Sequence, residues 1–111
     1  MDKDVTWSKT EKAVARKAYD EAYRKECAAI LAQLREMAAV AHEPRDIWHI
    51  HDLLTERRRD TDLKYDYRYS VLTHVLGRLL AEGWIDLPDI ADLREDKLEP
   101  IKRMADTYAG L

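Results

Sequence analysis

The chain has 111 residues, of which 46% are hydrophobic and 37% charged, and its formal net charge is −3. This length predicts a single domain, residues 1–111, with a modest core, because small domains bury a smaller share of their surface. The 22 acidic and 19 basic residues are interspersed, which argues against nucleic acid or acidic lipid as a partner. The absence of Phe, the few Gly and Pro residues and the abundance of Ala and Leu favour helices over sheet.

The first residues and the cysteine content predict a cytoplasmic protein. Residues 1–4 lack the apolar run of a signal peptide, and no stretch approaches the roughly 20 apolar residues of a membrane span. The single cysteine, Cys27, cannot form an intrachain disulfide and lies in a helical pattern among Ala and Ile. We interpret it as a small buried apolar residue in a reducing compartment rather than as a reactive thiol.

A long first helix is predicted over residues 8–41. Ser8 and Glu11 have the spacing of a capping box, in which each side chain binds a free backbone N–H of the other residue. No Gly or Pro interrupts the chain until Pro44. Apolar residues recur at alternating steps of four and three, which is typical of a coiled-coil-like seam: Tyr23, Cys27, Ile30, Leu34, Met37 and Ala41.

The length of this helix predicts a homodimer. At 1.5 Å per residue it would be roughly 50 Å long, whereas a compact globule of this size has a radius of gyration of about 13 Å. The distal half must therefore protrude or pack on another chain, and its apolar seam favours the second option. We expect Leu34 and Met37 of this seam to lie in the dimer interface.

A second helix is predicted after a short turn at Pro44, because proline removes a donor and disfavours helical backbone in the residue before it. Asp46 is predicted to be its N-cap. The charged run after Leu54 contains no helix breaker, so we expect the helix to continue as a solvated stretch to about Tyr65.

The rest of the chain predicts a compact head of short helices over about residues 66–111, whereas about residues 8–65 form the long-helix dimerisation region. A third helix should end at Gly83, and a further helical start is expected at Asp86 with Pro88 in its first turn. The final helix is predicted over residues 96–108, with Pro100 tolerated near its start. The third helix is marked by paired apolar rows: Val71, Leu72, Val75, Leu76, Leu79 and Leu80.

The sequence contains no pattern of an enzyme or a cofactor site. It has no Gly-rich phosphate loop, and Ser8 and Ser70 lack a nucleophile elbow. His49 and His51 lie about 200° apart on a helix and cannot share one metal, although a site assembled between subunits is an alternative in principle. We therefore expect neither enzymatic activity nor a cofactor nor a metal.

One stripe of the second helix is the candidate functional surface. Trp48 lies away from the stripe of Ile47, Ile50 and Leu54, and an exposed Trp bordered by charged residues is typical of a protein interface. The alternative is that Trp48 covers the first helix and Asp52 pairs with a nearby cation. At about 100° per residue, the stripe contains Trp48, His51, Asp52, Thr55 and Arg58 or Arg59.

Arg57, Arg58 and Arg59 invite a nucleic-acid interpretation, because consecutive arginines can neutralise phosphates. Acidic residues at positions 56, 60 and 62 weaken this basic patch. A solvated helix surface or an acidic docking partner explains the arginines better.

Residues 46–54 carry the most specific motif of the chain, D-x-W-x-x-H-D-x-L. With this motif the sequence resembles the fluorescence recovery protein family. The resemblance covers most of the chain, continuing through Arg57 and Arg58, Lys64 to Asp66, Arg68, Ser70 and Val71, Leu79 and Leu80, Glu82 and Gly83, and more weakly through Trp7, Ser8 and Arg16 to Tyr19.

This resemblance implies an all-α homodimer in which the long helices of two subunits pack antiparallel as a stalk and each C-terminal cluster forms a head. Family members bind the photoactivated orange carotenoid protein, chiefly through its C-terminal domain. They hasten its return to the dark orange state and help to release it from the phycobilisome, so that quenched fluorescence recovers. They are regulators and not enzymes.

The same resemblance implies roles for individual residues. Trp48, His51 and Arg58 would belong to the dimer interface and the surface beside it, and Asp52 to the patch that engages the carotenoid protein. On the head, the family's aromatic contact corresponds to His74, and the basic position of the last helix falls on Pro100, with Lys102 nearby.

These departures on the head leave a second interpretation open. In it the chain is a dimeric helical adaptor with a different protein partner, in a host without this light-harvesting system.

Overall fold

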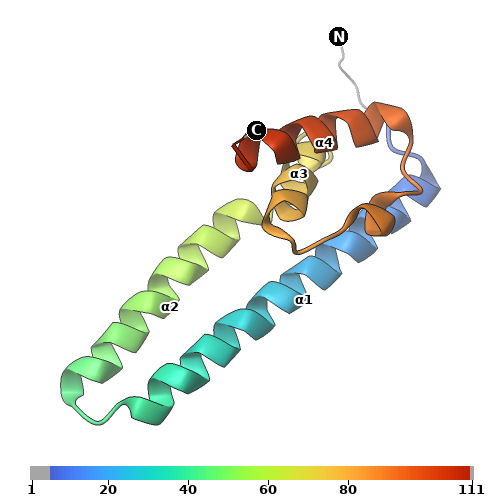
Figure 1. Ribbon diagram of the computed structural model, residues 1–111. Helices are drawn as coiled ribbons and strands as arrows, with labels where there is room; N and C mark the ends of the chain where they lie inside the picture. The colour runs from blue at the N-terminus through green and yellow to red at the C-terminus, as the bar shows by residue number, and fades with distance from the viewer. Residues whose placement is uncertain (1–5, 111) are drawn as a thin grey trace.

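The computed structural model describes residues 6–110, so residues 1–4, on which the expectation of no signal peptide rests, lie outside the described part. The fold is all-α, as predicted. Two long helices form a hairpin, and the shorter elements gather as a head around the first part of α1 (Figure 1). The elements are α1 (Lys9–Val40), α2 (Pro44–Lys64), α3 (Leu72–Glu82), the 3-10 helix η1 (Leu87–Ile90) and α4 (Glu95–Tyr108).

The molecule is elongated because the hairpin of α1 and α2 projects from the head (Figure 1). Its extents are 56 × 26 × 24 Å and its radius of gyration is 16.9 Å. A compact globule of this length would have a radius of gyration of about 13 Å. The predicted long first helix and the extended shape that it imposes are therefore confirmed. Within residues 6–110, no helix combines the length and the apolar character needed to cross a membrane.

The predicted capping box begins α1. The Ser8 backbone N–H donates to Glu11 Oε1 at 3.0 Å, and the Glu11 N–H donates to Ser8 Oγ at 3.1 Å. The helix continues without interruption to Val40 and ends at Ala41, where the backbone is extended.

The start of α2 differs from the prediction, because its N-cap is Glu43 and not Asp46. Pro44 has the φ angle that the first helical position requires, so the helix begins there. Asp46 is the third helical residue, and its Oδ2 accepts hydrogen bonds from the backbone N–H groups of His42 and Glu43, both at 3.0 Å. These bonds lower the pKa of Asp46.

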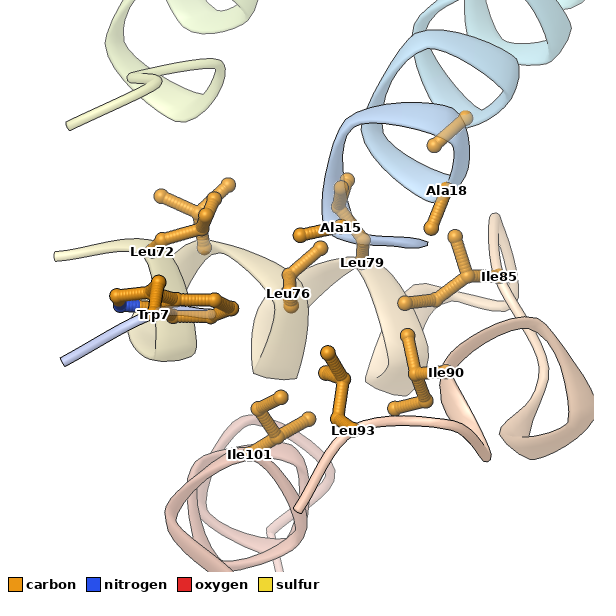
Figure 2. Packing of buried hydrophobic residues seen from close by; sticks show 12 residues of the cluster. Trp7, Ala15, Ala18, Leu72, Leu76, Leu79, Ile85, Ile90, Leu93 and Ile101 are labelled. Atoms are coloured by element: carbon orange, nitrogen blue, oxygen red, sulfur yellow. The ribbon is translucent and has the colours of Figure 1, made fainter. Parts of the chain in front are cut away.

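The hydrophobic core lies between α3, η1, α4 and the first part of α1 (Figure 2). Helices α3 and α4 approach closely at Gly77, where a Cβ would lie only 2.6 Å from Met104 Cβ. Gly83 ends α3 in the left-handed conformation at φ 83°, as predicted. The core side chains that Figure 2 labels are Trp7, Ala15, Ala18, Leu72, Leu76, Leu79, Ile85, Ile90, Leu93 and Ile101.

The last helix begins one residue before the predicted start, at Glu95, and Pro100 is its sixth residue. Pro100 thus lies beyond the first turn, in contrast to the expectation of a position near the start. Only the N–H groups of the first helical turn lack intrahelical acceptors. Beyond that turn a proline removes a helical hydrogen bond, and at Pro100 this is the bond to the carbonyl of Asp96.

The interpretation of Cys27 as a buried residue is wrong, since its side chain is only partly buried. It lines a groove between α1 and α2 together with Tyr23, Ile30 and Leu54. Tyr23, the first residue of the predicted seam, is 47% exposed. The second helix covers the seam of α1 incompletely, which leaves Leu34 and Met37 partly exposed as well.

Candidate protein-interaction surface

The outer face of α2 carries the candidate stripe. Trp48 is 62% exposed, and its ring meets the ring of His51 edge-on with centroids 6.4 Å apart. The alternative in which Trp48 covers the first helix does not agree with this exposure. The side of α2 that turns inward instead carries the buried residues Thr61 and Lys64.

The charged residues of the stripe have only weak, exposed partners. Asp52 Oδ1 lies 3.4 Å from Nδ1 of His51, and Arg58 Nε lies 3.0 Å from Asp62 Oδ2. The Asp52 side chain is 78% exposed and that of Arg58 is 81% exposed. Ion pairs at such exposure contribute about 0–1 kcal/mol, so both groups can exchange their partners for those of another protein at little cost.

Large apolar side chains are exposed near the turn of the hairpin. Val40 is 75% exposed and Ile47 is 59% exposed, and Trp48 follows directly. The exposure of Ile47 corrects the expectation that it shares the inner stripe of Ile50 and Leu54, which are partly buried. Apolar groups gathered at a protruding end are typical of an interaction surface.

The remaining residues of the predicted dimer interface lie on the other helix. Leu34 and Met37 are partly buried on α1. Near them, Arg57 Nη2 on α2 donates to Gln33 Oε1 on α1 at 3.1 Å, which links the two helices. The structure thus places Trp48, His51, Asp52 and Arg58 on α2, whereas Leu34 and Met37 lie on α1, along the seam that α2 covers incompletely.

The predicted head residues His74 and Lys102 line different hollows. His74 Nε2 lies 2.6 Å from the hydroxyl oxygen of Tyr108, and Arg78 stacks over the Tyr108 ring at 5.5 Å. These three residues line a hollow of about 450 Å³ at the end of α2. Lys102 lies beside Leu80 and Leu87 at a second hollow of about 420 Å³.

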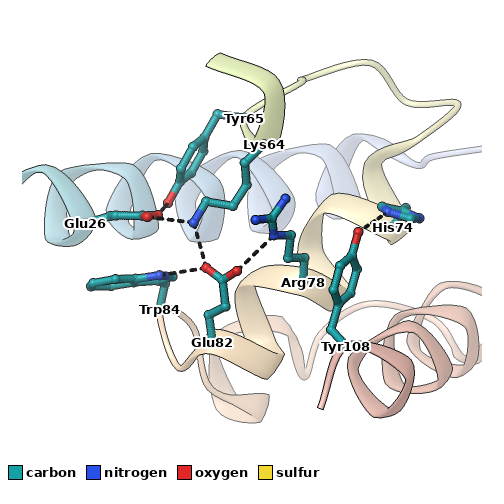
Figure 3. A network of polar contacts seen from close by, with 8 residues as sticks. All are labelled: Glu26, Lys64, Tyr65, His74, Arg78, Glu82, Trp84 and Tyr108. Atoms are coloured by element: carbon teal, nitrogen blue, oxygen red, sulfur yellow. Dashed lines mark hydrogen bonds and ion pairs between the residues drawn. The ribbon is translucent and has the colours of Figure 1, made fainter. Parts of the chain in front are cut away.

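Sequence reasoning missed an ionic network where the hairpin meets the head (Figure 3). The Lys64 ammonium at the end of α2 donates to Glu26 on α1 and to Glu82 on α3, both at 2.6 Å. Tyr65, Arg78 and Trp84 complete the network with hydrogen bonds of 2.8, 2.9 and 3.1 Å. The only local signal was the spacing of Arg78 and Glu82, since Glu26 lies 38 residues from Lys64.

A second buried ion pair was also missed. Lys97 is fully buried, and its ammonium lies 3.1 and 3.3 Å from the two carboxylate oxygens of Glu11. Burial raises the pKa of Glu11, but hydrogen bonds from the Arg94 and Ser8 backbones and from Lys97 outweigh it and lower the pKa to about 2. This pair joins the start of α1 to α4.

Within the described residues, no group of three or more His, Cys, Asp and Glu side chains could hold a metal ion.

Comparisons with known proteins agree with this architecture. The family model for the photoprotection regulator fluorescence recovery protein matches residues 7–105. The fluorescence recovery protein of Synechocystis sp. (strain ATCC 27184 / PCC 6803 / Kazusa) is 33% identical over 102 residues, which are 92% of this chain and 94% of that protein.

Two solved structures of such proteins share the fold. That of the Fremyella diplosiphon protein superimposes with a TM-score of 0.85 at 38% identity, covering 90% of this chain and 98% of the other. That of the Synechocystis sp. PCC 6803 protein gives 0.86 at 34% identity with the same coverage of both chains. The match extends over hairpin and head alike, and the chain therefore belongs to the fluorescence recovery protein family of non-enzymatic photoprotection regulators.

Proposed function

We propose that this chain is a homodimeric cytoplasmic regulator that binds the photoactivated orange carotenoid protein, or a similar C-terminal domain, and accelerates its return to the dark orange state. The observation that carries the proposal is the family match over residues 7–105. It includes the whole of the hairpin and nearly all of the head, so both parts of the molecule are covered by the match.

The proposed dimer uses about residues 8–65, with the hairpins of two copies packed antiparallel. Support comes from the protruding hairpin and from its exposed apolar side chains Val40, Ile47 and Trp48. An antiparallel second copy would bury these groups and the partly exposed Leu34 and Met37, and such burial is the main driving force for association. His51 and Arg58 would form the polar border of this interface.

The proposed contact with the carotenoid protein centres on Asp52. Its carboxylate is 78% exposed and can meet a cationic group of the partner, while the neighbouring Trp48 offers apolar area. A regulator speeds recovery only if it binds the state on the way to the dark form more tightly than the activated form. His74 and Lys102 on the head would provide the second contact region.

Timing the colour change tests the proposal. Orange carotenoid protein is photoactivated, mixed in the dark with this protein at increasing concentration, and followed by absorbance as it returns from red to orange. We expect a saturable increase in the recovery rate, and a clear loss of that increase for Asp52→Asn. Recovery at the unassisted rate at every concentration would contradict the proposal.

A second candidate is a dimeric helical adaptor with a different protein partner. The observation that favours it is the hydrogen bond of 2.6 Å between His74 and Tyr108, at the position where the resemblance places an aromatic contact. The colour-recovery assay separates the two candidates, because an adaptor with a different partner would leave colour recovery unchanged. Its mass in solution would still be that of a dimer.

A further inference from the structure

Helix α2 carries the proposed recognition surface but contributes no residue to the hydrophobic core. Its two buried residues, Thr61 and Lys64, are both polar and lie in its last turn. The segment that follows, residues 65–71, contains no helix. The apolar contacts of α2 are partly buried ones with α1, such as that of Leu54 beside Tyr23 and Ile30, and none of them joins α2 to the core of the head.

The Lys64 side chain, which is 5% exposed, provides the missing connection (Figure 3). Its ammonium bridges Glu26 of α1 and Glu82 of α3 at 2.6 Å each, so one cation joins three helices. The partners are themselves held: Tyr65 donates to Glu26, and Arg78 and Trp84 donate to Glu82. Burial raises the pKa of Glu82, but Lys64 and Arg78 outweigh this effect and lower it, so the carboxylate stays ionised.

A lysine is suited to this position. Its ammonium is a compact charge with three donors on a flexible stem, and it can satisfy two carboxylates from different helices at once. A buried charge that loses its partners is strongly disfavoured, so the arrangement resists displacement. Hydrogen bonds also have a preferred geometry, so bonds from Lys64 to fixed partners restrict the orientation of its side chain, whereas apolar contacts have no preferred direction.

The position of Lys64 fixes which side of α2 faces outward. Trp48 precedes Lys64 by sixteen residues, which at 100° per residue places the two side chains about 160° apart around the helix. When Lys64 points into the junction, Trp48 must point away from it. The exposure of 62% for Trp48 and 5% for the Lys64 side chain agrees with this geometry.

We infer that Lys64 is a positioning residue for recognition: by bridging Glu26 and Glu82 it holds the outer face of α2 at one orientation to the head. A partner that contacts both regions then meets a preformed surface and does not have to order it on binding. This inference rests on the proposed function only for the identity of that partner. The orientation itself can be measured without one.

The orientation is tested by the distance between two spin labels, measured by double electron–electron resonance. Labels are placed at Thr55→Cys on α2 and Asp106→Cys on α4 in a Cys27→Ala background, and labelled chains are diluted with unlabelled ones so that distances within one chain dominate. The test variant is Glu26→Gln/Lys64→Met/Glu82→Gln, which removes the three charges of the bridge together. Arg78 loses its ionic partner Glu82, but its side chain is 35% exposed and remains accessible to solvent. The matched control is Lys25→Met, because Lys25 is exposed on the neighbouring helix.

We expect a narrow distance distribution for the parent protein and the control, and a distinctly broader or shifted one for the triple variant at unchanged helix content by circular dichroism. An unchanged distribution in the folded triple variant would overturn the inference. If the triple variant does not fold, Lys64→Gln, which keeps a donor for one carboxylate, is measured in the same way and judged by the same criterion.

The functional consequence is measured with unlabelled protein in the colour-recovery assay. If the competent orientation falls to about one tenth of the population, the concentration needed for half-maximal acceleration rises about tenfold, while the maximal rate is retained. An unchanged half-maximal concentration with a broadened distance distribution would also overturn the inference. If the parent protein itself fails to accelerate recovery, the proposed function fails, and the distance measurement still decides on Lys64.

Discussion

The Glu11 side chain performs two tasks, and only one of them is local. As part of the capping box it binds the Ser8 backbone, and it also accepts hydrogen bonds from Lys97 and from the Arg94 backbone at the start of α4. The first task was predictable from a spacing of three residues. The second depends on a residue 86 positions away, and a single sequence contains no signal for such a pairing.

Replacing one partner of this pair should destabilise the fold strongly. Glu11→Gln leaves the fully buried Lys97 with only the Asp96 carboxylate, whose side chain is 61% exposed, as a charged partner. Breaking a buried ion pair costs about 3–5 kcal/mol. The measurement is the free energy of unfolding from chemical denaturation. The double variant Glu11→Gln/Lys97→Met should regain part of the loss, because it leaves no buried charge. Equal stability of Glu11→Gln and the parent protein would refute the role given to this pair.

The pair should also make stability depend on acid pH. The pKa of Glu11 is about 2 in the folded chain against an ordinary value of 4.5. Its stabilising contribution, up to about 3 kcal/mol, is therefore complete above pH 4.5 and lost as the pH falls from there towards 2. Unfolding free energies measured between pH 7 and 2.5 should show a shallower decline for the double variant than for the parent. Parallel declines would contradict this assignment.

Helices α3 and α4 depend on a close approach that one glycine permits. A Cβ at position 77 would lie 2.6 Å from Met104 Cβ and 2.8 Å from the Ile101 carbonyl oxygen, so neither neighbour can yield without moving backbone. The sequence predicted both helices from their apolar periodicity but gave no reason for a glycine inside the third. That reason appears only when the facing helix is in place.

The variant Gly77→Ala should therefore lower the stability of the head. Overpacking costs about 1–3 kcal/mol, which exceeds the gain of up to about 1 kcal/mol from the higher helix propensity of alanine. The thermal midpoint should fall accordingly. Gly83→Ala is the comparison, because its cost of about 1–2 kcal/mol comes only from the left-handed backbone, with open space around the new Cβ. A raised midpoint for Gly77→Ala would mean that α3 and α4 are not packed this closely.

For α2, sequence reasoning located the exposed stripe correctly and the helix start incorrectly. The stripe follows from helical periodicity, which tertiary contacts do not change. The start depended on whether Pro44 or Asp46 opens the helix, and both residue types favour that region. Ile47 was assigned to the inner stripe but is 59% exposed. The sequence could not predict this exposure, because the angle between α1 and α2 is not encoded in either helix alone.

The variant Trp48→Ala should weaken self-association more than folding. Trp48 is 62% exposed in the single chain, so its truncation should leave helix content unchanged. In the proposed dimer it is a large buried anchor, whose loss costs about 2 kcal/mol or more, which is at least a tenfold weaker dimer. Sedimentation velocity over a concentration series measures this shift. Leu87→Ala is the matched control, since Leu87 is 48% exposed on η1, outside the proposed dimerisation region of residues 8–65. An unchanged association constant would remove Trp48 from the interface.

At the scale of the whole molecule, an extended hairpin is attached to a small head. The sequence predicted that the first helix is too long for a compact globule of this size, because helix length and globule size are both set by simple geometry. It did not predict how α2 returns along α1 and reaches the head through Lys64, since that path depends on long-range charge pairing. The elongated shape, 56 Å in its longest extent, leaves apolar surface that a second copy can cover.

The purified protein should accordingly have twice the mass of the 13.0 kDa chain at working concentrations. Light scattering coupled to size-exclusion chromatography provides the mass independently of shape. A concentration-independent mass of one chain would contradict the proposed dimer, though it would leave the fold and family unaffected.

The most direct test of the account is the dark recovery of photoactivated orange carotenoid protein, timed with and without this protein. The recovery rate should rise with the amount of regulator and then saturate, and it should rise less with Asp52→Asn at equal concentration. Identical recovery curves with and without the protein, at concentrations where it is dimeric and folded, would contradict the proposed function.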